Sequence, residues 1–148
     1  MKLFEVTAEG TRRWASHLVK SEDRILFIIK YKGLPVGHIG YGDFGRGFEI
    51  CDVVRGEKTP PEVMRSALDA VIQWGLRIGM PSVFLRVAAD ANRALGLYHR
   101  AGFEPTGLQP LSKRSDGTIV SWIESNDPKE GWDRFFVDMV YRPELPTI

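Results

Sequence analysis

Apolar and polar positions alternate in blocks along this chain, and glycine-containing turns separate the blocks. The first half holds three β-rich segments, RILFIIKY at 24–31, PVGHIGYGDF at 35–44 and GFEICDVV at 47–54. Enrichment in β-branched and aromatic residues is typical of strands, and Lys32-Gly33 and the segment 45–47 supply the turns between them. We therefore predict an antiparallel meander of three strands.

A strand and a helix are predicted before the meander. KLFEVT at 2–7 has the composition of a strand, whereas the apolar positions of TRRWASHLVK at 11–20 recur with helical spacing. That spacing places Trp14 and Leu18, with His17 beside them, on the face of the helix that turns toward the rest of the protein.

The longest helix is predicted directly after the meander. Thr59 and Glu62 have the spacing of a capping box, Pro60 falls at the first helical position, and Gly79 marks the end of the segment. Apolar residues at helical spacing predict its buried face, and they are Val63, Ala67, Val71, Trp74 and Ile78.

The second half of the chain predicts how the sheet is completed. SVFLRVA at 82–88 is expected to be a strand and ANRALGLYHRA at 91–101 a helix, and a strand–helix–strand unit favours parallel pairing. LQPL, IVSWIES and RFFVDMVY are predicted as returning strands. The expected class is α+β: a central mixed sheet, with an antiparallel meander and then a parallel central pair, and helices on both faces. A crevice is expected where the pairing switches.

Composition narrows the functional classes. The 148 residues suit a single domain over 1–148, and the net charge of +1 does not favour a nucleic-acid partner. The longest aliphatic run, at 25–29, is far too short to span a membrane, and the N-terminal segment lacks the pattern of a secretory signal. A cytoplasmic location is therefore expected. The three histidines show no ligand spacing with carboxylates, so no metal site is predicted.

The segment from 49 to 103 carries a more specific pattern. A strand that ends in Arg55-Gly56, a long helix, the strand VFLRVA and then ANRALGLYHRAGF, with Ala94 four residues before Tyr98, follow one another. This order resembles the GNAT superfamily of acyl-CoA-dependent N-acyltransferases. The resemblance implies acetyl-CoA as co-substrate and direct transfer of its acetyl group to a primary amine of a small acceptor. Because homodimers are common in the family, it also suggests a homodimer.

The resemblance assigns roles at the reaction centre. Tyr98 matches the general acid that protonates the departing thiolate, and the backbone N–H groups of Val53 and Val54 match the site that polarises the thioester carbonyl. Glu49 matches a general base for the amine. From the residues alone, Asp43, Asp52 and His38 compete for that role. Without the resemblance, Tyr98 is better explained as an amphipathic core residue that packs the helix against the sheet. Cys51 is expected to be a small buried residue rather than a nucleophile.

The expected phosphate-binding loop departs from the family pattern. Arg55 and Gly56 match it, but its second glycine is absent, and two prolines at 60–61 lack N–H donors. Lys58, Arg55 and Arg65 are the cations predicted to replace those donors. The usual asparagine position holds Ala91, and Asn92 follows one place later.

Two alternatives follow from these departures. The start of the long helix is similar to a subset of the superfamily that acylates amino sugars linked to nucleotides, which suggests an amino-sugar acceptor. The degenerate loop instead suggests a GNAT-shaped module, without catalysis, that binds or interacts with a partner.

Overall fold

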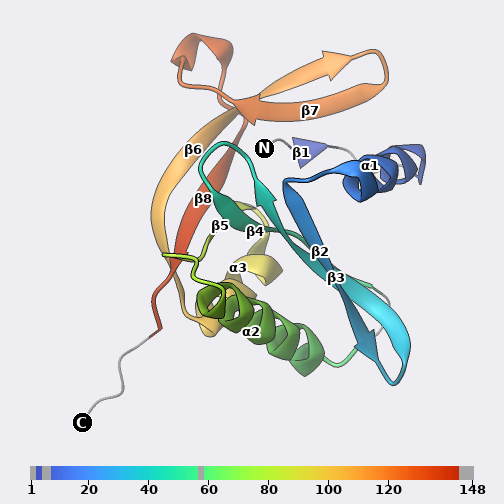
Figure 1. The fold of residues 1–148 in the computed structure, drawn as a ribbon. Coiled ribbons are helices and arrows are strands. Elements are labelled where there is room, and N and C mark those ends of the chain that lie inside the picture. Colours follow the sequence, from blue (N-terminus) through green and yellow to red (C-terminus); the bar gives the residue numbers. More distant parts are fainter. Residues whose placement is uncertain (1–2, 5–7, 57–58, 144–148) are drawn as a thin grey trace.

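The protein, described by a computed structural model over residues 3–4, 8–56 and 59–143, has its elements arranged around one mixed sheet (Figure 1). In chain order they are β1 (Leu3–Phe4), α1 (Ala8–Lys20), β2 (Arg24–Tyr31), β3 (Leu34–Asp43), β4 (Phe48–Arg55), α2 (Pro61–Arg77), β5 (Phe84–Ala88), α3 (Asn92–Ala101), β6 (Phe103–Asp116), β7 (Ile119–Glu124), η1 (Pro128–Glu130) and β8 (Arg134–Tyr141). Within the described residues the strand order is β1-β7-β6-β8-β5-β4-β3-β2. This arrangement confirms the α+β class with a central mixed sheet.

The predicted meander is confirmed. β2 pairs antiparallel with β3, and β3 pairs antiparallel with β4. The turn between β2 and β3 consists of Lys32 and Gly33, which have φ angles of 51° and 80°. Two successive residues in the left-handed region are what a two-residue hairpin turn requires, because its twist then matches that of the strands.

The parallel central pair is also confirmed. β4 leads through α2 into β5, and the two strands run parallel with Ile50 opposite Leu85. Figure 1 shows α2 and α3 packed together on one face of the sheet. They bury a shared core with that face, which includes Ile50, Leu85, Met64, Leu68 and Tyr98. α2 is also tied to β3, because the Tyr41 hydroxyl donates a hydrogen bond of 2.9 Å to the Val71 carbonyl.

Helix α1 contacts the opposite face of the sheet. Its Trp14 ring stacks on His38 of β3, with ring centroids 5.5 Å apart. His38 alternates with Ile39, whose side chain is buried in the core shared with α2, so the two side chains point to opposite faces. Helices therefore cover both faces, as predicted. The inward orientation predicted for His17 is wrong, because His17 is exposed.

The predicted start of α2 is wrong by one residue. Pro60 is the N-cap, with φ −56° and ψ 141°, Pro61 is the first helical residue, and no side-chain capping bond forms. The cause is local, since a proline disfavours the helical region for the residue before it, and Pro61 therefore keeps Pro60 extended. The capping box of Thr59 and Glu62 cannot close in this register.

The buried stripe of α2 is shifted relative to the prediction. Met64, Leu68, Val71 and Ile72 are buried, while Val63, Ala67 and Trp74 only border the core. Ile78 is 54% exposed, contrary to the prediction, because the helix ends at Arg77 and Ile78 is its C-cap. Gly79 follows with φ 93°, which explains why the helix stops there.

The C-terminal half adds strands to the β5 side of the sheet. β8 lies between β5 and β6 and pairs antiparallel with both, and β6 continues into a long hairpin with β7. The three strands predicted from the sequence are present, although β6 begins earlier, at Phe103. The strand predicted over 2–7 is described only at Leu3–Phe4, which pairs with β7. No helix among the described residues has the length and apolar character needed to cross a membrane.

Candidate active site

The parallel strands β4 and β5 share only a short contact. Their register contains the single pair Ile50–Leu85, after which β5 pairs with β8 alone. On its other side β4 pairs with β3, but the register shifts, with His38 opposite Val54 and Gly40 opposite Cys51. Asp52 and Val53 therefore form a bulge in β4. Among the described strands, neither of these two residues has a register partner, so a gap opens between β4 and β5.

Several contacts hold the bulge in place. Asp52 has a φ angle of 51°, which is unusual for a residue other than glycine. Its carbonyl lies 2.5 Å from Nδ1 of His38, the ring on which Trp14 stacks. The carbonyl of Val54 lies where a Cβ on Gly37 would clash with it, so only glycine permits this approach. A strained backbone that neighbouring groups enforce is typical of functional sites.

Tyr98 lies on the core side of the gap. Its side chain is 6% exposed, and its ring meets Phe103 edge-on with centroids 5.9 Å apart. Burial raises the pKa of the Tyr98 phenol to about 12, and the nearby Cys51 of β4 adds to this rise. The phenol therefore stays protonated at neutral pH. Its hydroxyl makes no hydrogen bond to any described residue, so it is available to donate.

Glu49 lies on the opposite face of β4 from Ile50, and its side chain is fully buried. Oε2 of Glu49 is 3.6 Å from Nη2 of Arg46 and 4.0 Å from Nε of Arg86. Neither carboxylate oxygen has a hydrogen-bond partner among the described residues. Burial raises the pKa of Glu49, and the two arginines offset part of the rise.

The charges around Glu49 continue along the same face of the sheet. Arg86 of β5 is ion-paired with Glu124 of β7 and lies 3.6 Å from Oδ1 of Asp138 of β8. Arg46 reaches the same Asp138 oxygen at 3.5 Å. Sequence reasoning missed Arg86, Asp138, Arg46 and Glu124. The sequence did contain a signal for Arg86 and Asp138, because each is a charged residue inside an otherwise apolar strand.

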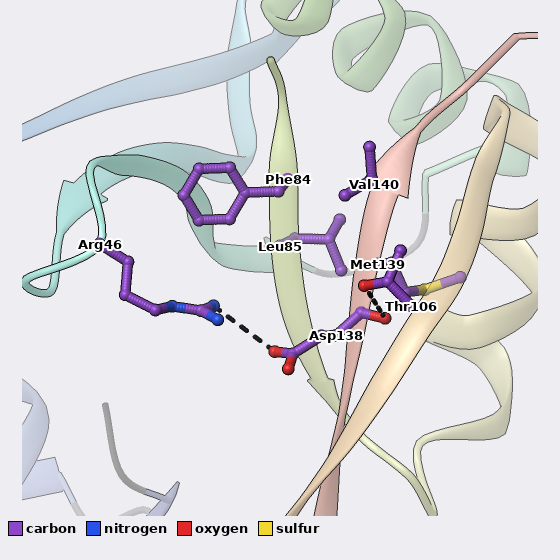
Figure 2. Close-up of a pocket in the computed structure, with 7 residues that line it drawn as sticks. All are labelled: Arg46, Phe84, Leu85, Thr106, Asp138, Met139 and Val140. Atoms are coloured by element: carbon purple, nitrogen blue, oxygen red, sulfur yellow. Dashed lines mark hydrogen bonds and ion pairs between the residues drawn. The ribbon is translucent and has the colours of Figure 1, made fainter. Parts of the chain in front are cut away.

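A pocket of about 250 Å³ opens beside these charges (Figure 2). Figure 2 shows Arg46 extending from its turn across the pocket toward Asp138, with Phe84 of β5 on one side. Leu85, Thr106, Met139 and Val140 also line the pocket. Since Phe84 and Asp138 alternate with the core residues Leu85 and Met139, the pocket lies on the face away from α2 and α3.

The predicted cofactor-binding residues are only partly brought together. Arg55 and Gly56 end β4 beside the gap, and the guanidinium of Arg55 donates to the Thr59 carbonyl. Gly56 N donates to the Val36 carbonyl at 2.6 Å, and a Cβ on Gly56 would lie 2.6 Å from the same oxygen. Lys58 lies outside the described residues. Arg65, further along α2, pairs with Asp69 at 3.2 Å.

Two other predicted residues differ in their surroundings. Asn92 is the first residue of α3 and is exposed, with Ala91 as the N-cap. Cys51 is buried, and the pKa of its thiol is raised by burial and by Asp52, so the thiol stays protonated. This environment matches the prediction of a small buried residue rather than a nucleophile.

Comparisons with known proteins identify the fold. No protein-family model matches the sequence, and no curated protein matches it. Among solved structures, a GNAT family acetyltransferase from Elizabethkingia anophelis with acetyl-CoA bound has a TM-score of 0.63 and 13% identity, over 98% of this chain and 97% of that one. An IAA acetyltransferase from Bacillus cereus has a TM-score of 0.63 and 12% identity, over 95% and 98%. Spermidine N-acetyltransferase from Vibrio cholerae, in complex with CoA and spermine, has a TM-score of 0.62 and 12% identity, over 93% and 77%.

These likenesses confirm the predicted resemblance at the level of the fold. The chain has the fold of the GNAT acetyltransferases, including its mixed sheet and the helices that flank it. Fold alone does not assign chemistry, so function has to be argued from the gap between β4 and β5 and the groups around it.

Proposed function

We propose that the protein is an acetyl-CoA-dependent N-acetyltransferase that transfers an acetyl group directly to the primary amine of a small acceptor. The observation that carries this proposal is the bulge at Asp52–Val53 in a splayed parallel pair, with the protonated phenol of Tyr98 beside it. Solved structures of the same fold have acetyl-CoA or CoA bound, which supports the choice of co-substrate.

The proposed roles follow from the position of each group. The backbone N–H groups of Val53, in the bulge, and of Val54, directly after it, donate to the thioester oxygen and stabilise the negative charge that develops there. The amine nitrogen forms a bond to the carbonyl carbon, and Glu49 takes up the proton that the amine loses. The carbon–sulfur bond then breaks, and Tyr98 donates its proton to the thiolate, so that the products are an amide and a thiol.

The alternative bases predicted from the sequence differ in their surroundings. Asp52 is paired with Arg24 at 3.6 Å, and Asp43 accepts a hydrogen bond from the Gly45 N–H in an exposed turn. His38 is better placed, because donating its Nδ1 proton to the Asp52 carbonyl leaves Nε2 as an acceptor. Glu49 is also ion-paired, with Arg46 at 3.6 Å, but burial raises its pKa and neither of its oxygens has a hydrogen-bond partner among the described residues. It therefore remains our first choice, and His38 is the second.

A second function is favoured by a different observation. Arg55 is already bonded to the Thr59 carbonyl, Arg65 is paired with Asp69, and two prolines remove N–H donors from the start of α2. A site for the CoA pyrophosphate is therefore less complete than the family pattern requires. This favours the alternative of a non-catalytic module that binds or interacts with a partner. An amino-sugar acceptor and a homodimer stay predictions.

Acetyl-CoA is expected to stabilise the folded protein. At roughly 100 times its dissociation constant, a ligand that binds only the native state adds about 2.7 kcal/mol to the free energy of unfolding. Differential scanning fluorimetry with increasing acetyl-CoA measures this as a rising Tm. An unchanged Tm at millimolar acetyl-CoA, with an unchanged Tm in CoA as well, would favour the non-catalytic module.

The replacement of lost N–H donors by cations makes a separate prediction. If Arg55 contacts the CoA pyrophosphate, Arg55→Ala is expected to weaken CoA binding by about 1.5 to 3 kcal/mol, the value of a charged hydrogen bond. Titration calorimetry compares this variant with Lys58→Ala, Arg65→Ala and the control Arg142→Ala, whose exposed side chain pairs with Glu104 alone among the described residues. Unchanged affinity in the first three variants would place the pyrophosphate elsewhere.

A further inference from the structure

The pocket on the outer face of the sheet is lined by two groups of opposite charge. Nη2 of Arg46 and Oδ1 of Asp138 form an ion pair at 3.5 Å in the pocket. Phe84 and Val140 form an apolar wall beside this pair. The guanidinium of Arg46 also lies 5.4 Å from the centroid of the Phe84 ring. Such a pocket is shaped for a small molecule that carries charge at one end and an apolar group at the other.

Two further charged side chains, Glu49 next to Arg46 and Arg86 next to Asp138, have polar atoms without a hydrogen-bond partner among the described residues. The carboxylate of Glu49 is fully buried, and the guanidinium of Arg86 belongs to a side chain that is 6% exposed. Both Glu49 oxygens and Arg86 Nε lack a hydrogen-bond partner among the described residues. Buried polar groups are normally bonded, so an unbonded set points to a ligand or water that completes it.

We propose that this pocket binds the acceptor as an aminocarboxylate, with its ammonium at Asp138 and its carboxylate at Arg46. The inference rests on the proposed function and names the chemical class of its acceptor. It places the amine on the face of β4 that carries Glu49, opposite the core side from which Tyr98 approaches the gap.

The opposite charges of Arg46 and Asp138 favour a zwitterion over a simple amine. A ligand with only an ammonium group pairs with Asp138, and it leaves Arg46 with Glu49 as its ion-pair partner at 3.6 Å. A ligand with only a carboxylate pairs with Arg46, and it leaves Asp138 with Arg86 at 3.6 Å. A ligand that carries both groups gives each of the two lining charges a new partner, which offsets the cost of separating a partly buried pair.

The backbone around Arg46 allows the side chain to adjust to such a ligand. Arg46 stands between Gly45 and Gly47, whose φ angles are 91° and 95°. A Cβ on either glycine would meet nothing within 4 Å, so there is open space on both sides of Arg46. Arg46 is therefore able to leave Asp138 and keep a contact with the carboxylate of the ligand.

The test compares amines that differ only in the carboxylate. Leucine, leucinamide and 3-methylbutylamine share a side chain, and glucosamine represents an acceptor without a carboxylate. Acetylation is measured as thiol release from acetyl-CoA, and binding of each compound to the free protein is measured by calorimetry. We expect leucine to exceed both leucinamide and 3-methylbutylamine by about tenfold or more in kcat/KM and in affinity, as the loss of a charged hydrogen bond implies.

Variants then connect this preference to Arg46. Arg46→Gln is expected to bring the ratio of leucine to leucinamide down by about tenfold, since glutamine keeps a donor but loses the charge. Arg114→Gln is the matched control, because Arg114 is a similarly exposed arginine that pairs with Glu130 on the β6–β7 side of the sheet. Circular dichroism of each variant verifies that the fold is retained.

The outcomes separate this inference from the proposed function. Equal use of leucine and 3-methylbutylamine, a preference for glucosamine, or a leucine preference that survives in Arg46→Gln would overturn the aminocarboxylate assignment while leaving acetyl transfer intact. Leucine binding that depends on Arg46, without thiol release from any acceptor, would support the pocket assignment and contradict the transferase. No binding and no acetylation of any aminocarboxylate would overturn the inference outright.

Discussion

Replacing Tyr98 by phenylalanine is expected to lower turnover by about 100-fold or more, because a general acid contributes roughly 10² to 10⁴ to the rate. The ring and its contact with Phe103 remain, and the hydroxyl makes no hydrogen bond to any described residue. Stability and acetyl-CoA binding should therefore change little. Steady-state kinetics and Tm measured on the same sample separate the two effects, provided that the chemical step limits the rate.

Tyr41 offers a matched control for this experiment. Its phenol is also buried, and burial raises its pKa to about 12, but it donates a hydrogen bond to the Val71 carbonyl. Tyr41→Phe is expected to cost about 1 kcal/mol of stability, while turnover per folded molecule is preserved. If Tyr98→Phe behaves in the same way, with turnover within about threefold of the parent, Tyr98 is a packing residue and not the acid.

The second large effect is expected for Glu49→Gln. If Glu49 is the base, turnover should fall by about 10²-fold or more, since glutamine cannot accept the proton. The pH profile tests the same assignment. The parent kcat/KM should rise with pH through the pKa of Glu49, which burial places above 4.5, and this rise should be absent in the variant.

The free energy of unfolding should fall as pH rises, whereas kcat/KM should rise. Because the pKa of Glu49 is raised in the folded protein, the native state keeps this proton at pH values where the unfolded chain has lost it. The free energy of unfolding therefore falls as pH rises from the unfolded pKa through the folded one. Glu49→Gln removes this dependence and should be at least as stable as the parent at neutral pH, as urea unfolding at several pH values will show.

A second carboxylate serves as the control for Glu49. Glu104 is exposed and pairs with Arg142 at 3.7 Å, far along the chain from the gap. Glu104→Gln should leave both the pH profile and turnover unchanged. Retained turnover with an unchanged pH profile in Glu49→Gln would contradict the assignment and shift it to His38. His38→Gln should then lower turnover by about 10²-fold or more, with the bulge checked by the binding of acetyl-CoA.

Much of the fold was determined by local features of the sequence. The meander followed from β-rich segments separated by Lys32-Gly33 and by the glycines at 45 and 47, all of which have φ angles that their turns require. The parallel pairing of β4 and β5 followed from the helix between them. The end of α3 is also a local feature, because Gly102 has a left-handed φ of 108° and stops the helix. Each of these features depends on neighbours within a few residues.

Local patterns misled where two signals competed. Thr59 and Glu62 suggested a capping box, but the constraint that Pro61 places on Pro60 moved the helix start by one residue. Ile78 matched the apolar period of α2, yet the helix ended before it. The resemblance to the GNAT superfamily identified Tyr98, Glu49, Val53 and Val54 as candidates. The structure places Val53 in the bulge of β4 with Val54 directly after it, and it places Tyr98 in the core and Glu49 on the opposite face of β4. Their roles stay predictions.

The pocket was decided only by the tertiary structure. Arg46 and Asp138 are 92 residues apart in the chain, and Arg86 meets Glu124 and Asp138 because β8 inserts between β5 and β6. No local pattern encodes that insertion or the register of the strands. The sequence by itself determined which segments are strands and helices, because periodicity and turn chemistry act over short distances. Which charges face one another was fixed by long-range pairing, because contacts between distant strands depend on the packing of the whole sheet.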